Sequence, residues 1–297
     1  MQEITNYGKV FETLIKKTTK YLIDNNIKAQ ILGISGGIDS TVVAAICHEV
    51  FERTGIPLIG RSLPTKYNKE DEISTAKLVG KAFCNDFEEV PIKNPYESFL
   101  SLLDRAECGM TPIANGNIQA RLRMIYLYNL ASIYGGLVMD TDNLTENNLG
   151  YFTIHGDVGD FNPIGGLWKT EVFKLAEYLI DFYRMTGQID KGIAMFNSWS
   201  LKPTAGLGIT NNDLEELGAE SYDQVDRILQ EILTWDDLSN SVYIHYTTDE
   251  KIKAFLEVQQ MLDIPTDVII AVANRHFKSE FKRKQLPIKI TYNEILV

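Results

Sequence analysis

The residues best suited to chemistry lie together in one short loop, residues 33–41, with the sequence GISGGIDST. The glycine pair Gly36 and Gly37 lets the backbone turn sharply and come close to a ligand. A helix is predicted to begin near Ser40, and its free N–H groups and positive dipole end would face the loop. Together these features predict a binding site for phosphate. Further hydrogen-bond donors come from the hydroxyl groups of Ser35, Ser40 and Thr41.

Asp39 places a carboxylate in the middle of this anion-binding loop. A carboxylate beside phosphate groups is explained by a bound cation, and Mg²⁺ is the usual one. The alternative is a tight strand-to-helix turn in which Ser and Asp only cap the helix. The full SGGxDS pattern, between a predicted strand and an amphipathic helix, favours the binding site. The loop is neither a Walker A motif nor a G-x-G-x-x-G dinucleotide-binding turn.

The elements that must position this loop alternate between strands and helices. A buried strand is predicted over residues 30–34, and a helix directly follows the loop. This alternation predicts an α/β fold with a Rossmann-like, doubly wound parallel sheet and helices on both faces. Ligands of such sheets bind at the carboxyl ends of the strands. The remaining strands are predicted at 56–63, 86–92 and 135–141, and the helices at 4–24, 69–83, 95–106, 116–134 and 169–183.

The chain has 297 residues with 29 Lys+Arg and 40 Asp+Glu, which gives a formal net charge of −11. This charge argues against nucleic acid or an anionic membrane as a partner, because both would repel it. Nine acidic residues and one basic residue lie in residues 211–240, which we interpret as a solvated helical appendage. We therefore expect a single domain over residues 1–297, with an α/β core at about 28–205 and a helical C-terminal part at about 206–297.

The cysteines and the N-terminal residues indicate a cellular compartment. Cys47, Cys84 and Cys108 are too few and too scattered for a disulfide framework or a zinc site. The N-terminus has no apolar core of a secretory signal. No apolar run reaches the ~18 residues of a membrane span. We therefore expect a cytoplasmic protein.

The loop SGGIDST resembles the pyrophosphate-binding loop of the N-type ATP pyrophosphatases. That superfamily splits ATP between its α and β phosphates and adenylates a carboxylate or a carbonyl oxygen. Other motifs follow in the order seen in ammonia-dependent NAD synthetases, so the resemblance covers about residues 5 to 290. These motifs are GNIQARLRM (116–124), MDTDNLTENNLGYFTIHGD (139–157), NPIGGLWKTEV (162–172), KPTAGL (202–207), ESYDQVDRIL (220–229) and SEFKRKQLP (279–287).

The resemblance implies a ligase that amidates deamido-NAD with ammonia at the expense of ATP. The nicotinate carboxylate would attack the α-phosphorus of ATP, and ammonia would then attack the acyl adenylate, giving NAD, AMP and pyrophosphate. It further implies Mg²⁺ as a cofactor and a homodimer with the dinucleotide site across the interface. The expected partners are small molecules: ATP, deamido-NAD and ammonia, the last either free or delivered by a separate protein.

On the ATP side, the resemblance assigns the metal to Asp39 and Glu146 and catalytic roles to Asp39 and Lys169. Glu146 follows the predicted strand 135–141, at a carboxyl end where a site belongs. Arg61 stands one residue before the place of an ATP-contacting arginine, and a shift by one residue turns a strand side chain to the other face. The implied ATP contacts are Gly33, Ile34, Ser35, Gly36, Gly37, Ile38, Asp39, Ser40, Arg61, Thr141, Lys169 and Thr204.

On the substrate side, two positions differ from the family pattern. Ile154 stands where many relatives carry a substrate-binding lysine, and Phe281 stands where they carry a histidine. His155 is a candidate replacement for the lysine. Arg123 would point away from Arg121 on a helix. The implied contacts with deamido-NAD are Arg121, His155, Asp160, Phe281 and Lys282.

Two other functions remain open at this point. One is another adenylating ATP pyrophosphatase of the tRNA-modifying type, against which the negative net charge speaks. The other is a non-catalytic module that binds ATP, which the altered positions Ile154 and Phe281 keep open.

Overall fold

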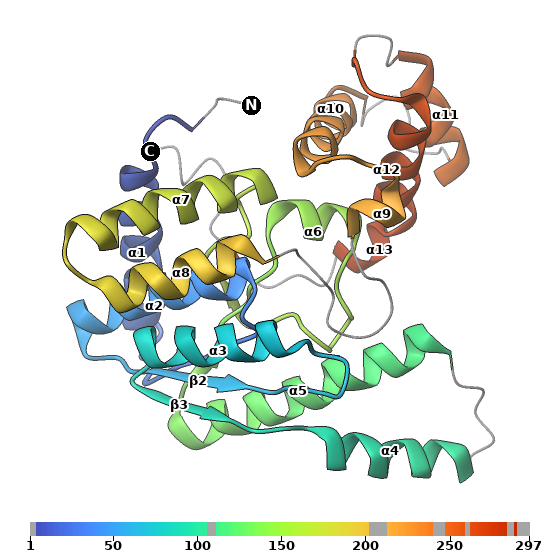
Figure 1. Cartoon of the computed structure of the whole chain (residues 1–297). Coiled ribbons are helices and arrows are strands. Elements are labelled where there is room, and N and C mark those ends of the chain that lie inside the picture. The colour runs from blue at the N-terminus through green and yellow to red at the C-terminus, as the bar shows by residue number, and fades with distance from the viewer. Residues whose placement is uncertain are drawn as a thin grey trace.

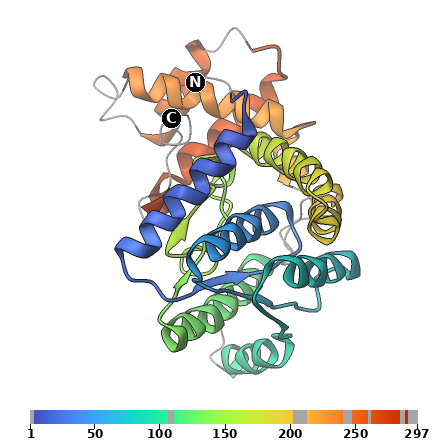
Figure 2. The same cartoon turned by 90° about the vertical axis from the view of Figure 1, so that its left-hand side faces the viewer.

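The computed structural model has a four-stranded parallel sheet at its centre (Figures 1 and 2), with the strand order β3-β2-β1-β4. From β1 the chain first adds β2 and β3 on one side and later adds β4 on the other side. This change of side is the switch point of a doubly wound sheet and confirms the predicted Rossmann-like α/β fold. The strands are β1 Gln30–Gly33, β2 Leu58–Ser62, β3 Asp86–Glu89 and β4 Leu137–Val138. The residues that the structure describes are 4–105, 111–201, 213–239, 247–258, 262–283 and 288–289.

The sheet carries apolar side chains on both faces, which explains why helices cover each face. Successive residues of a strand point to opposite faces. Ile31, Ile59 and Val138 therefore pack into the core beneath α5 (Pro112–Tyr134). Leu32 and Leu58, each next in the chain to one of these, pack into the larger core. This core is formed with α1 (Tyr7–Asp24), α2 (Ile38–Thr54) and α7 (Lys169–Met185). Figure 2 shows the sheet between these two helical layers.

The helices of the α/β part lie on the two faces as the alternation predicts. Helix α5 begins at Pro112, four residues earlier than predicted, because Thr111 caps it and proline suits the first helical position. Helices α6 and α8 were not predicted. The bounds are α1 Tyr7–Asp24, α2 Ile38–Thr54, α3 Glu70–Phe83, α4 Lys93–Arg105, α5 Pro112–Tyr134, α6 Leu144–Leu149, α7 Lys169–Met185 and α8 Ile189–Ser200.

The described C-terminal residues form helices with an apolar core of their own. Leu149 of α6 and Trp168, which precedes α7, belong to the same core and tie it to the α/β part. The boundary predicted near residue 205 lies outside the described residues. The C-terminal elements are α9 Asp213–Leu217, α10 Tyr222–Ser239, α11 Thr248–Val258, α12 Thr266–Lys278 and α13 Glu280–Arg283, and β6 Ile288–Lys289 pairs in parallel with β5 Phe161–Asn162.

All four strands of the sheet are shorter than predicted. The strand expected at 135–141 is regular only over Leu137–Val138, after which Met139 forms a single bridge with Phe161. The strand expected at 86–92 ends at Glu89. In the part of the chain that the structure describes, no helix is long and apolar enough to cross a membrane. Cys47 and Cys84 are free thiols, and Cys108 lies outside the described residues.

Candidate functional site

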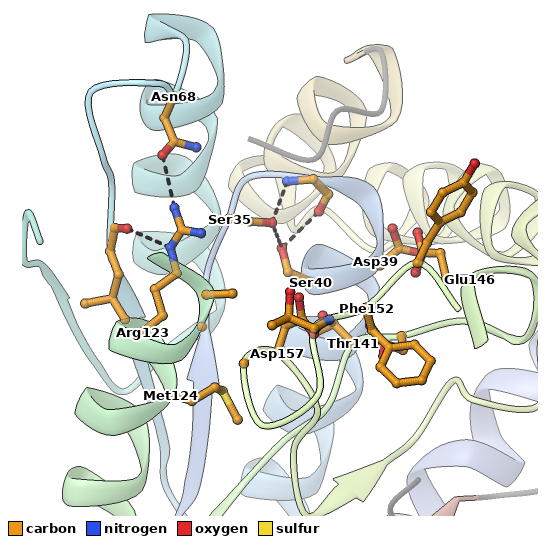
Figure 3. Close-up of a pocket in the computed structure, with 18 of the residues that line it drawn as sticks. Ser35, Asp39, Ser40, Asn68, Arg123, Met124, Thr141, Glu146, Phe152 and Asp157 are labelled. Atoms are coloured by element: carbon orange, nitrogen blue, oxygen red, sulfur yellow. Dashed lines mark hydrogen bonds between the residues drawn. The ribbon is translucent and has the colours of Figure 1, made fainter. Parts of the chain in front are cut away.

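The glycine-rich loop joins the carboxyl end of β1 to the first turn of α2. Gly36 has a φ of +87°, and a Cβ there would lie 2.4 Å from the carbonyl oxygen of Glu72. Only glycine fits such a position. The Ser35 hydroxyl accepts a hydrogen bond from the Gly37 N–H and lies 3.0 Å from the Ser40 hydroxyl (Figure 3). The loop therefore forms a tight turn that leads directly into the N-terminus of α2.

A cavity of about 830 Å³ opens at the carboxyl ends of β1, β2 and β4. This volume is in the range of small-molecule sites, and the position is the one expected for a doubly wound sheet. Gly36 is absent from the cavity lining, and its role is to form the turn. The expected site residues that line the cavity are Gly33, Ile34, Ser35, Gly37, Ile38, Asp39, Ser40, Arg61, Thr141, Glu146, Lys169 and Lys282.

The centre of the cavity wall is a lysine shared by two carboxylates. The Lys169 Nζ lies 2.5 Å from Asp39 Oδ2 and 2.9 Å from Glu146 Oε1. The Lys169 side chain is only 2% exposed, while the two carboxylates are 17% and 18% exposed. Burial alone would lower the pKa of Lys169, but the two negative charges hold it well above its ordinary value. The lysine therefore remains charged inside the wall.

Asn143 holds the other oxygen of each carboxylate. Its side-chain amide donates to Asp39 Oδ1 at 2.9 Å, and its backbone N–H donates to Glu146 Oε2 at 3.2 Å. The Asn143 carbonyl oxygen of the side chain in turn accepts from the Glu146 N–H, which completes a capping box at the start of α6. Asn143 is not among the site residues expected from the sequence. The capping-box pattern N-x-x-E, at residues 143–146, is the signal that could have found it.

Three further carboxylates lie beside the cavity: Asp140 and Asp142 are buried, and Asp157 is half-buried. Burial raises the pKa of Asp140 to about 7 and that of Asp157 to about 6. Burial and the neighbouring negative charges raise the pKa of Asp142 as well, and its Oδ2 has no hydrogen-bond partner among the described residues. Asp142 and Asp157 line the cavity, so both are additional candidates for handling protons. None of the three is among the site residues expected from the sequence.

The arginines that line the cavity differ in the partners of their charge. The Arg61 guanidinium forms an ion pair with Asp86 at 2.8 Å and donates to the Gly60 carbonyl. Arg61 therefore lines the cavity with a charge that Asp86 of β3 already compensates. Arg123 also lines the cavity, opposite Asp39 and Glu146 in Figure 3. Burial lowers its pKa to about 10, so Arg123 stays cationic at neutral pH.

Arg121 faces a second hollow of about 650 Å³, as expected for a residue two positions from Arg123 on a helix. His155 and Asp160 line the same hollow, so three of the five expected substrate contacts come together there. Met124 and Phe152 line both hollows and form the wall between them. Asp160 is held firmly, because it accepts from the Tyr128 hydroxyl at 3.0 Å and from the Val138 N–H at 2.9 Å.

The two C-terminal expectations have different outcomes. Lys282 lines the larger cavity, where its Nζ donates to the carbonyls of Gly150 and Phe152. Phe281 is 60% exposed and lines neither hollow. Of these two residues, only Lys282 is placed to contact a ligand in a hollow of this chain. Thr204 lies outside the described residues. Among the described residues, no group of three or more His, Cys, Asp and Glu is arranged to hold a metal ion.

Comparison with known proteins gives one consistent result. The model of the NAD synthase family matches residues 10–286. The NH3-dependent NAD(+) synthetase of Finegoldia magna is 34% identical over 75% of this chain and 85% of the relative. That of Methanocaldococcus jannaschii is 31% identical over 95% and 98%. The NMN synthetase structure from Francisella tularensis has a TM-score of 0.71 at 25% identity and covers 94% of this chain and 97% of its own. The chain therefore belongs to the NAD synthase family.

Proposed function

We propose that the protein is an ammonia-dependent NAD synthetase, which forms the amide of NAD from deamido-NAD, ammonia and ATP. The observation that carries this proposal is the placement of Lys169, Asp39 and Glu146 beside a phosphate-binding loop in one cavity. The relatives from Finegoldia magna and Methanocaldococcus jannaschii are NH3-dependent NAD(+) synthetases. This favours the proposal over a tRNA-modifying enzyme or a non-catalytic ATP-binding module.

The phosphates of ATP would lie against the loop of residues 33–41. The first N–H groups of α2 and its dipole stabilise negative charge there. Lys169 adds a buried positive charge at the same end of the cavity. Stabilisation is needed most when pyrophosphate leaves, because charge builds up on it in that step.

Asp39 and Glu146 would hold Mg²⁺. The donor set fits, since Mg²⁺ sites in nucleotide enzymes use one or two carboxylates together with phosphate oxygens. The two carboxylates already converge on one cation, the Lys169 ammonium group. When bound, the ion would neutralise negative charge on the phosphates.

The acceptor carboxylate would attack the α-phosphorus of ATP, and ammonia would then attack the activated carbonyl. A carboxylate is a poor acyl donor, and adenylation gives it a good leaving group. The chain contributes position and charge rather than a nucleophile. Asp157 lines the cavity, and its pKa is raised to about 6 by burial, so we propose that it accepts the proton that the attacking amine must lose.

A mononucleotide acceptor is the second candidate. It is favoured by the match to the Francisella NMN synthetase over nearly the whole chain. Ile154 in the second hollow, where many relatives carry a lysine, is compatible with a smaller acceptor. The same centre would then amidate nicotinate mononucleotide, because the reacting carboxylate is identical.

The decisive experiment supplies ATP, Mg²⁺ and ammonia with either acceptor and measures NAD, NMN, AMP and pyrophosphate by chromatography. Equal amounts of amide, AMP and pyrophosphate are expected, with deamido-NAD preferred. A preference for the mononucleotide would select the second candidate. Formation of neither amide by folded, ATP-binding protein would refute both.

We also propose that the protein is a homodimer that pairs through the outer face of α5. Ile125 and Ile133 on this face are each 65% exposed, and Ile125 also lines the second hollow. A partner copy on this face would bury apolar surface and cover the acceptor side of the site. Ile125→Glu should give a monomer in light scattering, while Ile23→Glu on α1, at 58% exposure in the parent, should leave the dimer intact. A monomeric parent would contradict the proposal.

A further inference from the structure

We propose that Asp226, a residue of α10 that does not line the cavity, positions Lys169 and Glu146 for the reaction. The inference rests on the proposed function for its consequence but on separate contacts for its geometry. Asp226 is 2% exposed, and its side chain points from α10 to the starts of α6 and α7.

The Asp226 carboxylate accepts three hydrogen bonds from two threonines. Its Oδ1 accepts from the Thr145 hydroxyl at 2.5 Å. Its Oδ2 accepts from the Thr170 hydroxyl at 2.7 Å and from the Thr170 N–H at 3.0 Å. A single carboxylate therefore joins the first turn of α6 to the first turn of α7.

Both threonines are direct neighbours of the residues in the cavity. Thr145 precedes Glu146, and Thr170 follows Lys169. The Thr145 hydroxyl also accepts a hydrogen bond from the Lys169 N–H at 2.8 Å. Asp226 and Thr145 thus satisfy the first two N–H groups of α7, which have no partner within their own helix. The backbone positions of Glu146 and Lys169 are set by one shared network.

The chemistry of Asp226 indicates positioning rather than packing. The neighbouring residues of α10, Val225, Ile228 and Leu229, already supply its apolar contacts with the C-terminal core. A buried carboxylate costs free energy unless hydrogen bonds compensate it. Burial raises the pKa of Asp226 to about 6, and the bonds from Thr145 and Thr170 oppose that rise. The Asp226 carboxylate fixes the first turns of α6 and α7 relative to each other, which an apolar side chain could not do.

The expected consequence is confined to the ATP and metal side. Lys169 contacts Asp39 and Glu146 only if α7 keeps its place relative to α6 and α2. Loss of Asp226 releases both first turns, so the lysine and the carboxylates no longer converge. The residues of the second hollow do not depend on this network, since they belong to α5 and to the loop of residues 152–160.

The test compares Asp226→Ala, Asp226→Asn and Thr170→Val with the parent. The control is Asp223→Asn, on the same helix but with a side chain 71% exposed in the parent. The measurements are kcat, KM for ATP and for the acceptor, the half-saturating Mg²⁺ concentration, and Mn²⁺ binding in the presence of ATP by electron paramagnetic resonance. Circular dichroism checks the fold.

Asp226→Ala should lower kcat/KM for ATP by about 10- to 100-fold and raise the half-saturating Mg²⁺ concentration, with KM for the acceptor unchanged. Asp226→Asn should lose less, because its amide oxygen can still accept from one threonine. Thr170→Val should show a smaller effect in the same direction, and Asp223→Asn none. Thr170→Val and Asp226→Asn keep the test valid if Asp226→Ala does not fold.

Two results would overturn the positioning role. The first is that Asp226→Asn and Thr170→Val both have the same kinetic constants and the same Mg²⁺ dependence as the parent. The other is an equal loss towards ATP and acceptor with unchanged Mn²⁺ binding, since this would reflect a smaller folded fraction only. If the parent forms no amide, the proposed function fails by itself, and the Mn²⁺ and ATP binding of the variants still decides the role of Asp226.

Discussion

At the scale of single residues, the site depends on one ammonium group held between two carboxylates. Asn143 and Lys169 between them engage both oxygens of Asp39 and both oxygens of Glu146. A divalent ion that binds these carboxylates must therefore compete with the charge of Lys169. ATP offers the lysine another anionic partner, so nucleotide and metal binding should support each other.

Lys169→Met tests this competition without any turnover. Removing the internal cation leaves two carboxylates uncompensated, so Mn²⁺ should bind about tenfold or more tightly in the absence of nucleotide. ATP should bind more weakly, because a positive charge is lost. Titration calorimetry measures both. The control Asp39→Asn/Lys169→Met should lose the gain, and an unchanged Mn²⁺ affinity in Lys169→Met would contradict the competition.

Motifs located most of this centre, because a motif states residue types at fixed spacing. Asp39 and Lys169 lie more than a hundred residues apart in the chain, yet the Lys169 Nζ lies 2.5 Å from an oxygen of Asp39 and 2.9 Å from an oxygen of Glu146. The partners of a side chain are less visible in a sequence. Arg61 lines the cavity but is paired with Asp86, and Arg123 lines the cavity as well, because small differences in strand and helix direction decide which partners a side chain meets.

At the scale of elements, the strand-to-helix junction carries the strictest geometric demand. Gly36 combines a positive φ with a close approach of α3, whose Glu72 carbonyl occupies the space of a side chain. The alternation of strands and helices could be predicted because β1 is a short apolar run and helices such as α1 and α7 carry a clear apolar face. The short α6 could not, since six residues held by a capping box show no period.

Gly36→Ala and Gly55→Ala together separate two costs of a methyl group: the steric clash with α3 and the strain of a positive φ. Gly55, at the other end of α2, also has a positive φ, of +75°, but a Cβ there meets nothing within 4 Å. Gly55→Ala should therefore cost about 1 kcal/mol of unfolding free energy. Gly36→Ala should cost about 2–4 kcal/mol and weaken ATP binding, because α3 or the loop must move. Urea denaturation and ATP titration measure these effects, and equal costs at both positions would argue against the clash.

At the scale of the whole molecule, charge is distributed so that an acidic chain can bind anions. The net charge is −11, and much of it lies in α9 and α10, on the C-terminal helices. The cavity itself gathers Lys169, Arg123 and Lys282 together with the start of α2. Buried acids accompany these cations, and their ionisation connects the site to the stability of the fold.

Asp140 gives this connection a definite pH dependence. Its pKa is raised from 3.8 to about 7 by burial, so the folded state holds the proton more tightly than the unfolded state. The stability that protonated Asp140 contributes is fully present below about pH 3.8 and is lost as the pH rises through about 7. The loss is at most about 4 kcal/mol.

Asp140→Asn should therefore show a smaller decrease in unfolding free energy between pH 5 and pH 8 than the parent, measured by urea denaturation at both values. The comparison uses the difference between two pH values because the substitution also disturbs the bonds from the Asp142 N–H and the Asn162 amide, which act at every pH. Asp223→Asn, at an exposed position, should follow the parent. An identical pH dependence in parent and Asp140→Asn would show that another group carries the titration.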